Sequence, residues 1–261
     1  MIGLWRDEKH VYTASYDDLQ ATVPGVTGIL KVLDKPAIVP WAQGIVAEAA
    51  IRNRDKLAEW VAVGGEEGAI TLLKRAAETQ RDKAASTGSE VHSLADALNR
   101  GIPVTIPDEL APFVSAYQKW VADFEPHFLA SEQMVYSSLG YGGTLDSIAV
   151  IAGETWLLDI KTSKGTYSET ALQLAAYAYA DFIGRPGDPQ RYAIPAIDQF
   201  GVVHVRPEGA ELIPYDVTPD TFEAFRAVKR AHDWRMTKAK TVIGQAIGPA
   251  LLNFAREKVP A

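Results

Sequence analysis

The residues best suited to chemistry lie between positions 143 and 177. Gly143-Thr144-Leu145-Asp146 is followed by Leu157-Leu158-Asp159-Ile160-Lys161-Thr162 and then by Gln173-Leu174-Ala175-Ala176-Tyr177. These segments therefore contain two carboxylates and one lysine among mostly apolar residues. Carboxylate oxygens are the ligands that Mg²⁺ and Mn²⁺ prefer in proteins. A cation held by them, with a lysine beside it, would have the chemistry to hydrolyse a phosphodiester.

The spacing predicts a β-hairpin that brings the two aspartates together. Residues 143–151 and 155–163 are rich in β-branched and apolar side chains, and a short loop separates them. A three-residue loop would place Asp146 opposite Ile160, whereas a one-residue bulge would place it opposite Asp159. In either register the carboxylates are neighbours. Their repulsion would destabilise the sheet unless a cation or a proton lay between them.

Side-chain alternation predicts that Asp159 and Lys161 point to the same side of their strand. An isolated pair of this kind could equally be a solvated charge pair at the end of a strand. The helix predicted to follow carries Gln173 and Tyr177 four residues apart, and therefore on one face. Together with Asp146 on the partner strand, that helix favours a functional site.

A lone histidine, His92, precedes these segments. Thr87-Gly88-Ser89-Glu90 has the spacing of a capping box, which predicts that a helix begins there and that Glu90 is a helix-start residue. His92 would lie beside the apolar stripe of that helix, where a histidine is more often structural or solvated than a metal ligand.

The order of the predicted elements indicates an α/β protein. Reduced to its middle, the order is helix, three strands, helix, strand, followed by a further strand and two closing helices. The helices are expected near 28–33, 41–51, 66–85, 89–99, 108–124 and from about 168. The strands are expected within 1–16 and near 130–138, 143–151, 155–163, 197–205 and 211–215.

Composition sets wider limits on the class of protein. The chain has 261 residues, of which 47% are hydrophobic, so it can bury a sizeable core. It contains no cysteine, which excludes disulfides, zinc–thiolate sites and cysteine-ligated iron–sulfur clusters. It shows no leader segment and no run of eighteen apolar residues, so we expect a soluble cytoplasmic protein.

The distribution of charge leaves two interpretations of the C-terminal segment. The net charge of −7 argues against a nucleic-acid partner if the charge is evenly spread. After residue 225, however, the cationic residues outnumber the acidic ones, so this tail would be either a basic face that contacts DNA or a set of ordinary solvated helix faces. These cationic residues are Arg226, Lys229, Arg230, Arg235, Lys238, Lys240, Arg256 and Lys258.

Taken in order, the segments around His92, Asp146, Asp159–Lys161 and Gln173–Tyr177 resemble the motifs of the PD-(D/E)xK nuclease superfamily, and within it the RecB-like exonuclease branch. Val26-Thr27-Gly28-Ile29-Leu30 with Pro40-Trp41 also looks like the phage-encoded members of that branch, which are related to the CRISPR-associated exonucleases. The motifs span residues 26–177, and the ordered set is far more specific than any one of its members.

The resemblance implies a single nuclease domain over residues 1–261. It would comprise a helical elaboration over about 20–85, a restriction-endonuclease-like core over about 86–215 and basic C-terminal helices over about 216–261. Many relatives hold an iron–sulfur cluster with four cysteines, and this chain lacks them. No segment has the pattern of a phosphate-binding loop of an ATP-driven motor.

The resemblance also implies the roles of the residues at the site. His92, Asp146 and Asp159 would bind Mg²⁺ or Mn²⁺ together with the backbone carbonyl of Ile160. Asp146, Asp159 and Lys161 would be the catalytic residues. Lys161 would orient or activate the attacking water and stabilise the charge that builds up on the phosphate.

Other residues would contact the DNA. Gln173 and Tyr177 match an element that holds the DNA strand near the scissile bond, and Lys164, Lys238 and Lys240 are further cations expected to bind the phosphate backbone. We therefore expect a metal-dependent DNA exonuclease of phage recombination or DNA processing, active in a bacterial host's cytoplasm with a recombinase or single-strand annealing partner. The alternatives are a structure-selective endonuclease on the same core and a non-catalytic DNA-binding or assembly module.

Overall fold

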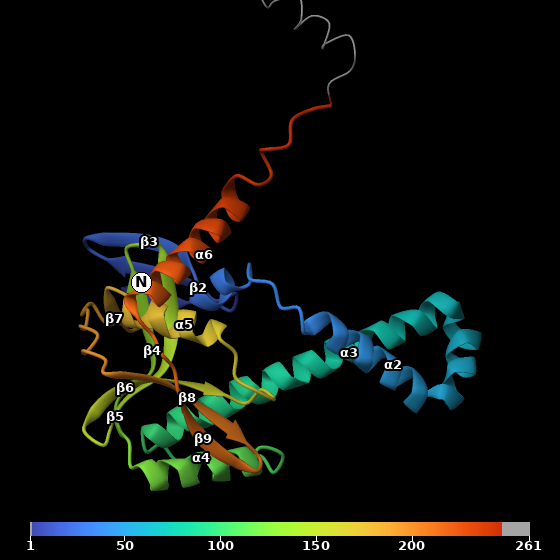
Figure 1. Cartoon of the computed structure of the whole chain (residues 1–261), viewed down its shortest axis with the longest axis horizontal. Coiled ribbons are helices and arrows are strands. Elements are labelled where there is room, and N and C mark those ends of the chain that lie inside the picture. The colour runs from blue at the N-terminus through green and yellow to red at the C-terminus, as the bar shows by residue number, and fades with distance from the viewer. Residues whose placement is uncertain (1, 247–261) are drawn as a thin grey trace, which may run out of the picture.

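A six-stranded mixed sheet lies at the centre of the computed structural model, which describes residues 2–246 (Figure 1). The strands run in the order β7-β4-β5-β6-β8-β9, and β6 and β8 are parallel while the other neighbours are antiparallel. The fold class is therefore mixed α/β. The strands of this sheet are β4 (His127–Ser137), β5 (Tyr141–Ile151), β6 (Glu154–Lys161), β7 (Phe182–Gly184), β8 (Gln199–Arg206) and β9 (Gly209–Pro214).

Helices cover both faces of the sheet, so β5 and β6 are buried on both sides. One face packs against α1, α5 and α6, whose side chains Ile29, Leu174 and Phe225 are fully buried. The other face packs against α4 and the C-terminal part of α3, through side chains such as Trp120 and Ala95. The helices are α1 (Val26–Leu30), α2 (Ile38–Arg52), α3 (Arg54–Asn99), α4 (Ala111–Phe124), α5 (Glu169–Ala178) and α6 (Pro219–Thr237).

A second, three-stranded antiparallel sheet packs against one edge of the large one. It consists of β1 (Gly3–Arg6), β2 (Val11–Tyr16) and β3 (Leu19–Pro24). Its inner face buries Leu4 and Tyr16 against Phe182, and the rings of Tyr16 and Phe182 meet edge to face at 5.5 Å. The sequence predicted strand structure within residues 1–16 but missed β3.

Helix α2 and the first half of α3 run side by side and project away from both sheets (Figure 1). None of the side chains of α2 is buried. The break predicted at Gly64-Gly65 is confirmed, since Gly65 has φ 67° and ψ 177° and interrupts the helix. The helical elaboration therefore begins at Ile38, and the prediction that it begins near residue 20 is wrong because β3 and α1 belong to the packed core.

The helix break predicted at Gly88 is wrong. Residues 87–90 lie inside α3, and Glu90 accepts a hydrogen bond from the Ser86 hydroxyl at 2.7 Å instead of capping a helix start. A glycine at position 88 is explained by a close contact instead, because a Cβ atom there would lie 3.3 Å from Thr162 Oγ1. The glycine lets α3 pass close to the end of β6.

The predicted hairpin forms, but its turn is shorter than expected. Ile151 pairs with Glu154 across a two-residue turn whose residues, Ala152 and Gly153, have φ values of 52° and 88°. Positive φ at both positions is what a type I′ hairpin turn requires. The prediction of a three-residue loop is therefore wrong. The ladder ends at the pair Ser147–Leu158, so Asp146 and Asp159 are the next residues along the two strands. The bulged alternative also placed these two aspartates opposite each other.

The C-terminal segment contains one helix, α6, in the part of the chain that the structure describes. Residues 238–246 form no second helix, and the remainder of the predicted basic segment, 247–261, lies outside the described residues. Among residues 2–246, no helix is both long and apolar enough to cross a membrane.

Candidate metal centre and its cleft

A cleft of about 1410 Å³ opens between the large sheet, the small sheet and helices α3 and α5. It brings together most of the residues that the sequence singled out from four separate segments. Those lining it are His92, Asp146, Asp159, Lys161, Lys164, Gln173 and Tyr177. Lys238 and Lys240 do not line the cleft; they follow α6 and their side chains are exposed.

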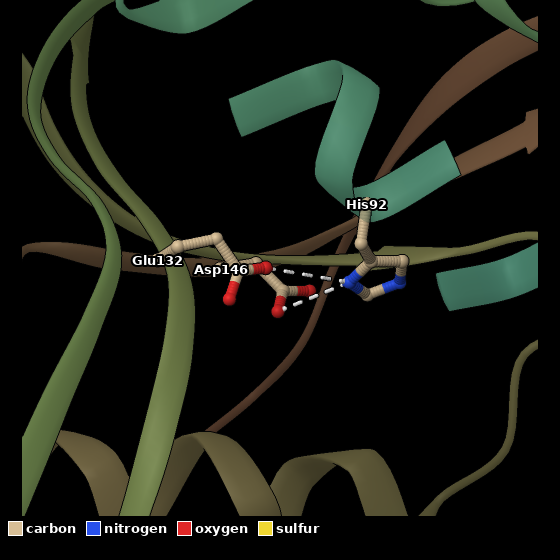
Figure 2. A group of neighbouring side chains, drawn as sticks. All are labelled: His92, Glu132 and Asp146. Carbon is tan, nitrogen blue, oxygen red and sulfur yellow. Dashed lines mark ion pairs between the residues drawn. The ribbon is translucent and has the colours of Figure 1, made fainter. Parts of the chain in front are cut away.

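Three side chains converge at the floor of the cleft: His92 from α3, Glu132 from β4 and Asp146 from β5 (Figure 2). His92 Nδ1 lies 3.3 Å from Asp146 Oδ1 and 3.9 Å from Glu132 Oε1. One possible ligand atom from each residue lies within 4.8 Å of the others. One imidazole and two carboxylates at this separation suit a divalent cation.

Glu132 is the member of this cluster that the sequence analysis missed. The pairs Ser131–Ser147 and Gln133–Leu145 flank it, so it lies across the ladder from Asp146. Its φ of 47° is left-handed, a conformation that costs a non-glycine residue about 1–3 kcal/mol and persists where the surroundings enforce it. A single glutamate in a predicted strand carries little signal, because most such residues are solvated.

Asp159 and Lys161 form a second group beside the first. Asp159 is 1% exposed, and Lys161 Nζ lies 2.6 Å from its Oδ2. Gln173 Nε2 donates to Asp159 Oδ1 at 2.8 Å and lies 3.2 Å from the Tyr177 hydroxyl. Within residues 2–246, the partner of Oδ2 is the Lys161 ammonium, which is both an ion-pair and a hydrogen-bond partner, so a bound cation would share this oxygen with Lys161.

A backbone hydrogen bond joins the two groups. The amide of Ile160 donates to Asp146 Oδ2 at 2.6 Å, so β6 fixes the carboxylate that β5 carries. The predicted registry of Asp159 and Lys161 on one side of β6 is confirmed by their ion pair. The ligand role assigned to the Ile160 carbonyl stays a prediction.

The pKa directions follow from burial and from the charges in the cluster. Burial, the largest single effect, would lower the pKa of His92, but the charge and hydrogen bond of Asp146 together with the charge of Asp159 outweigh it and raise the pKa to about 9. Burial, reinforced by the charge of Asp146, raises the pKa of Glu132 to about 7. Burial also raises the pKa of Asp159, because Lys161 does not fully offset it and Asp146 adds repulsion. A bound cation would relieve this repulsion, so the electrostatics also suit a metal ion.

The available ligand atoms limit which metal ions could bind here. With no cysteine in the chain, a cysteine-ligated iron–sulfur cluster and a thiolate site are excluded. Carboxylate oxygens and one imidazole accommodate Mg²⁺ or Mn²⁺ but do not by themselves select one of them.

Comparison with known proteins does not assign the chain to a family. No family model matches it. No curated protein matches it. Sixteen chains of solved structures match, among them the crystal structure of SSO0001, which is 16% identical and is matched over 53% of this chain and 67% of that chain with a TM-score of 0.29. Similarity at so low a TM-score does not establish a shared fold or function.

Proposed function

We propose that the protein is a Mg²⁺- or Mn²⁺-dependent deoxyribonuclease that acts as an exonuclease. The observation that carries the proposal is the convergence of His92, Glu132 and Asp146 at the floor of a cleft, with Asp159 and Lys161 beside them. A site that only bound a metal ion would not need a lysine beside the cluster. The partly buried lysine next to it favours a reaction in which negative charge develops.

The proposal includes the fold of the PD-(D/E)xK superfamily. The order α4, β4, β5, β6, α5, β8 agrees with a restriction-endonuclease-like core of helix, three strands, helix and strand, with β7 inserted before the last strand. The motif order supports the RecB-like branch and its phage-encoded members. Such an enzyme would act in a bacterial host's cytoplasm beside a recombinase or annealing protein.

Each residue of the site would have a separate role in phosphodiester hydrolysis. His92, Glu132 and Asp146 would hold the ion, with Asp159 Oδ2 adjacent. When bound, the ion would acidify a water molecule and neutralise phosphoryl oxygens. Lys161, held by Asp159, would place a positive charge near the phosphate and orient the attacking water. Gln173 would fix the rotamer of Asp159 through its hydrogen bond.

The rest of the cleft supports a polyanionic substrate. Although the chain carries a net charge of −7, cationic side chains gather around the acidic floor. They come from both sheets, from α3, from the segment before α2 and from the loop between β6 and α5, so they surround the floor rather than follow one element. They are Arg6, Lys35, Arg81, Lys83, Lys164 and Arg206. Such a distribution attracts phosphates locally.

The test is degradation of end-labelled linear DNA beside covalently closed circular DNA, with Mg²⁺, with Mn²⁺ and with chelator. The wild type is compared with Asp159→Asn, which keeps the size of the side chain, and with the control Asp220→Asn, which changes an exposed residue in the first turn of α6. We expect metal-dependent loss of the linear DNA alone, absent in Asp159→Asn and unchanged in the control.

Other outcomes would correct the proposal in defined ways. Cleavage of the closed circles would make the protein an endonuclease on the same site. Binding of DNA without cleavage under any metal condition would favour the non-catalytic module. Cleavage by a folded Asp159→Asn protein at the wild-type rate would remove the site assignment.

A further inference from the structure

Arg6 extends from the small sheet into the cleft. It follows Leu4 by two residues on β1, so both side chains point to the inner side of that sheet. Leu4 is fully buried between the two sheets, whereas Arg6 lies at the strand end, is exposed and lines the cleft. Its Nη1 atom donates to Thr144 Oγ1 at 3.3 Å.

Thr144 provides a rigid anchor for this arginine. It lies two residues before Asp146 on β5, and its hydroxyl also lies 2.9 Å from the Tyr12 hydroxyl. Tyr12 packs directly on Gly142, where a Cβ atom would lie only 2.6 Å from Tyr12 Cβ. The small sheet is therefore held against β5, and Arg6 is positioned relative to the strand that carries Asp146.

The charge of Arg6 acts on the cluster formed by His92, Glu132 and Asp146. Its guanidinium is among the charges that lower the pKa of Glu132 against burial and the repulsion of Asp146. Lys161 is paired with Asp159. Two cations therefore lie near the carboxylates of the site: Arg6, which is bonded to Thr144 two residues from Asp146, and Lys161, which is paired with Asp159.

The guanidinium of Arg6 also has unused hydrogen-bond capacity. The guanidinium donates through Nη1 to Thr144 and also contacts the Tyr12 hydroxyl, and these two contacts leave N–H donors of the guanidinium for a ligand. An arginine presents five N–H donors in a planar fork that fits two oxygens of one phosphate. An exposed fork beside an acidic floor is a suitable contact for an anionic ligand that crosses the floor.

We propose that Arg6, anchored by Thr144, forms a phosphate-binding subsite beside the metal centre and holds the phosphodiester next to the one being cleaved. The inference rests on the proposed nuclease function and identifies the residue that would set the position of the strand. Arg6 is a positioning residue in this account, since Lys161 and the metal ligands face the reacting phosphate.

The test uses oligonucleotides that each carry one uncharged methylphosphonate linkage, at successive positions, with binding measured in Ca²⁺ and cleavage in Mn²⁺. For the wild type, we expect one linkage next to the cleavage position at which neutralisation weakens binding about tenfold, the usual effect of losing one charge-assisted hydrogen bond. Arg6→Gln should bind the unmodified strand about tenfold more weakly and lose the sensitivity at that one linkage.

Two further variants keep the result interpretable. Arg6→Lys, which keeps the charge but not the fork, should show intermediate affinity. Arg54→Gln changes an exposed arginine at the start of α3, outside the cleft, and should bind like the wild type. Thermal melting of each variant reports its folding.

The possible results separate the subsite from the proposed function. Wild-type affinity in Arg6→Gln, or weaker affinity that keeps the methylphosphonate sensitivity of the wild type, would overturn the subsite. A wild type that binds DNA with the expected sensitivity but does not cleave it would refute the nuclease and support the subsite. A wild type that binds no oligonucleotide would overturn both.

Discussion

Gly143→Ala tests how α5 is seated on β5, the contact that places Gln173 over Asp159. A Cβ atom at residue 143 would lie 2.3 Å from Cε1 and 3.0 Å from Cδ1 of Tyr177. Tyr177 is 3% exposed, and its hydroxyl is tied to Gln173. The ring can therefore move away from residue 143 only by breaking this contact and shifting toward the cleft that it lines.

The size of the effect follows from this overlap. Carbon atoms pack at about 3.5–4.0 Å, so the ring or the strand must shift by more than about 1 Å. Overpacking of a core in this way costs about 1–3 kcal/mol of unfolding free energy. For a chain of this size the loss corresponds to a decrease in melting temperature of about 2–12 °C. Displaced Gln173 would also release Asp159, so cleavage should fall with stability.

A double-mutant cycle with Tyr177→Ala provides the assay, with urea unfolding as the measurement. Tyr177→Ala alone should cost about 3–5 kcal/mol, as large aromatic truncations do. The added methyl should cost little once the ring is gone, so the coupling energy should be about 1–3 kcal/mol. Gly44→Ala is the control, because nothing lies within 4 Å of its new methyl group. Additive costs for Gly143→Ala and Tyr177→Ala would refute the seating of α5 described here.

Two further predictions concern the cleft and the C-terminal segment. Metal binding requires neutral His92 and ionised Glu132, whose pKa values are raised to about 9 and about 7, so Mn²⁺ affinity should rise between pH 6.5 and 8.5 with release of protons. Calorimetry in buffers of different ionisation enthalpy checks this, and a flat affinity without proton release would contradict it. Replacing Lys238 and Lys240 with glutamine should weaken DNA binding mainly at low salt and reduce the salt slope by about 2. An unchanged slope in a binding titration would show that these lysines are only solvated.

Local patterns in the sequence were sufficient to predict two of the side-chain contacts in the cleft. The period of two along β6 placed Asp159 and Lys161 on one side, and the structure pairs them at 2.6 Å. The spacing of four along α5 placed Gln173 and Tyr177 together, and they lie 3.2 Å apart. Each of these predictions depends on neighbours within one element, where geometry follows directly from spacing.

Features that depend on distant contacts escaped the sequence analysis. Glu132 joins the cluster because β4 pairs with β5 in one register and because its own backbone is left-handed, and neither fact can be seen in its sequence neighbourhood. Gly88 has the appearance of a helix break, but its role depends on Thr162, more than seventy residues away along the chain. The two-residue turn depends on a positive φ at Ala152, a conformation that alanine rarely adopts and that its sequence neighbourhood does not indicate.

The anomalous scattering of Mn²⁺ in crystals of the wild type and of Asp146→Asn would show directly whether a metal ion binds at His92, Glu132 and Asp146. We expect one strong manganese peak in the wild type, within coordination distance of these three side chains, that is lost or greatly weakened in the variant. A wild-type crystal whose manganese peaks all lie away from this cluster would contradict the metal centre and, with it, the proposed chemistry of the cleft.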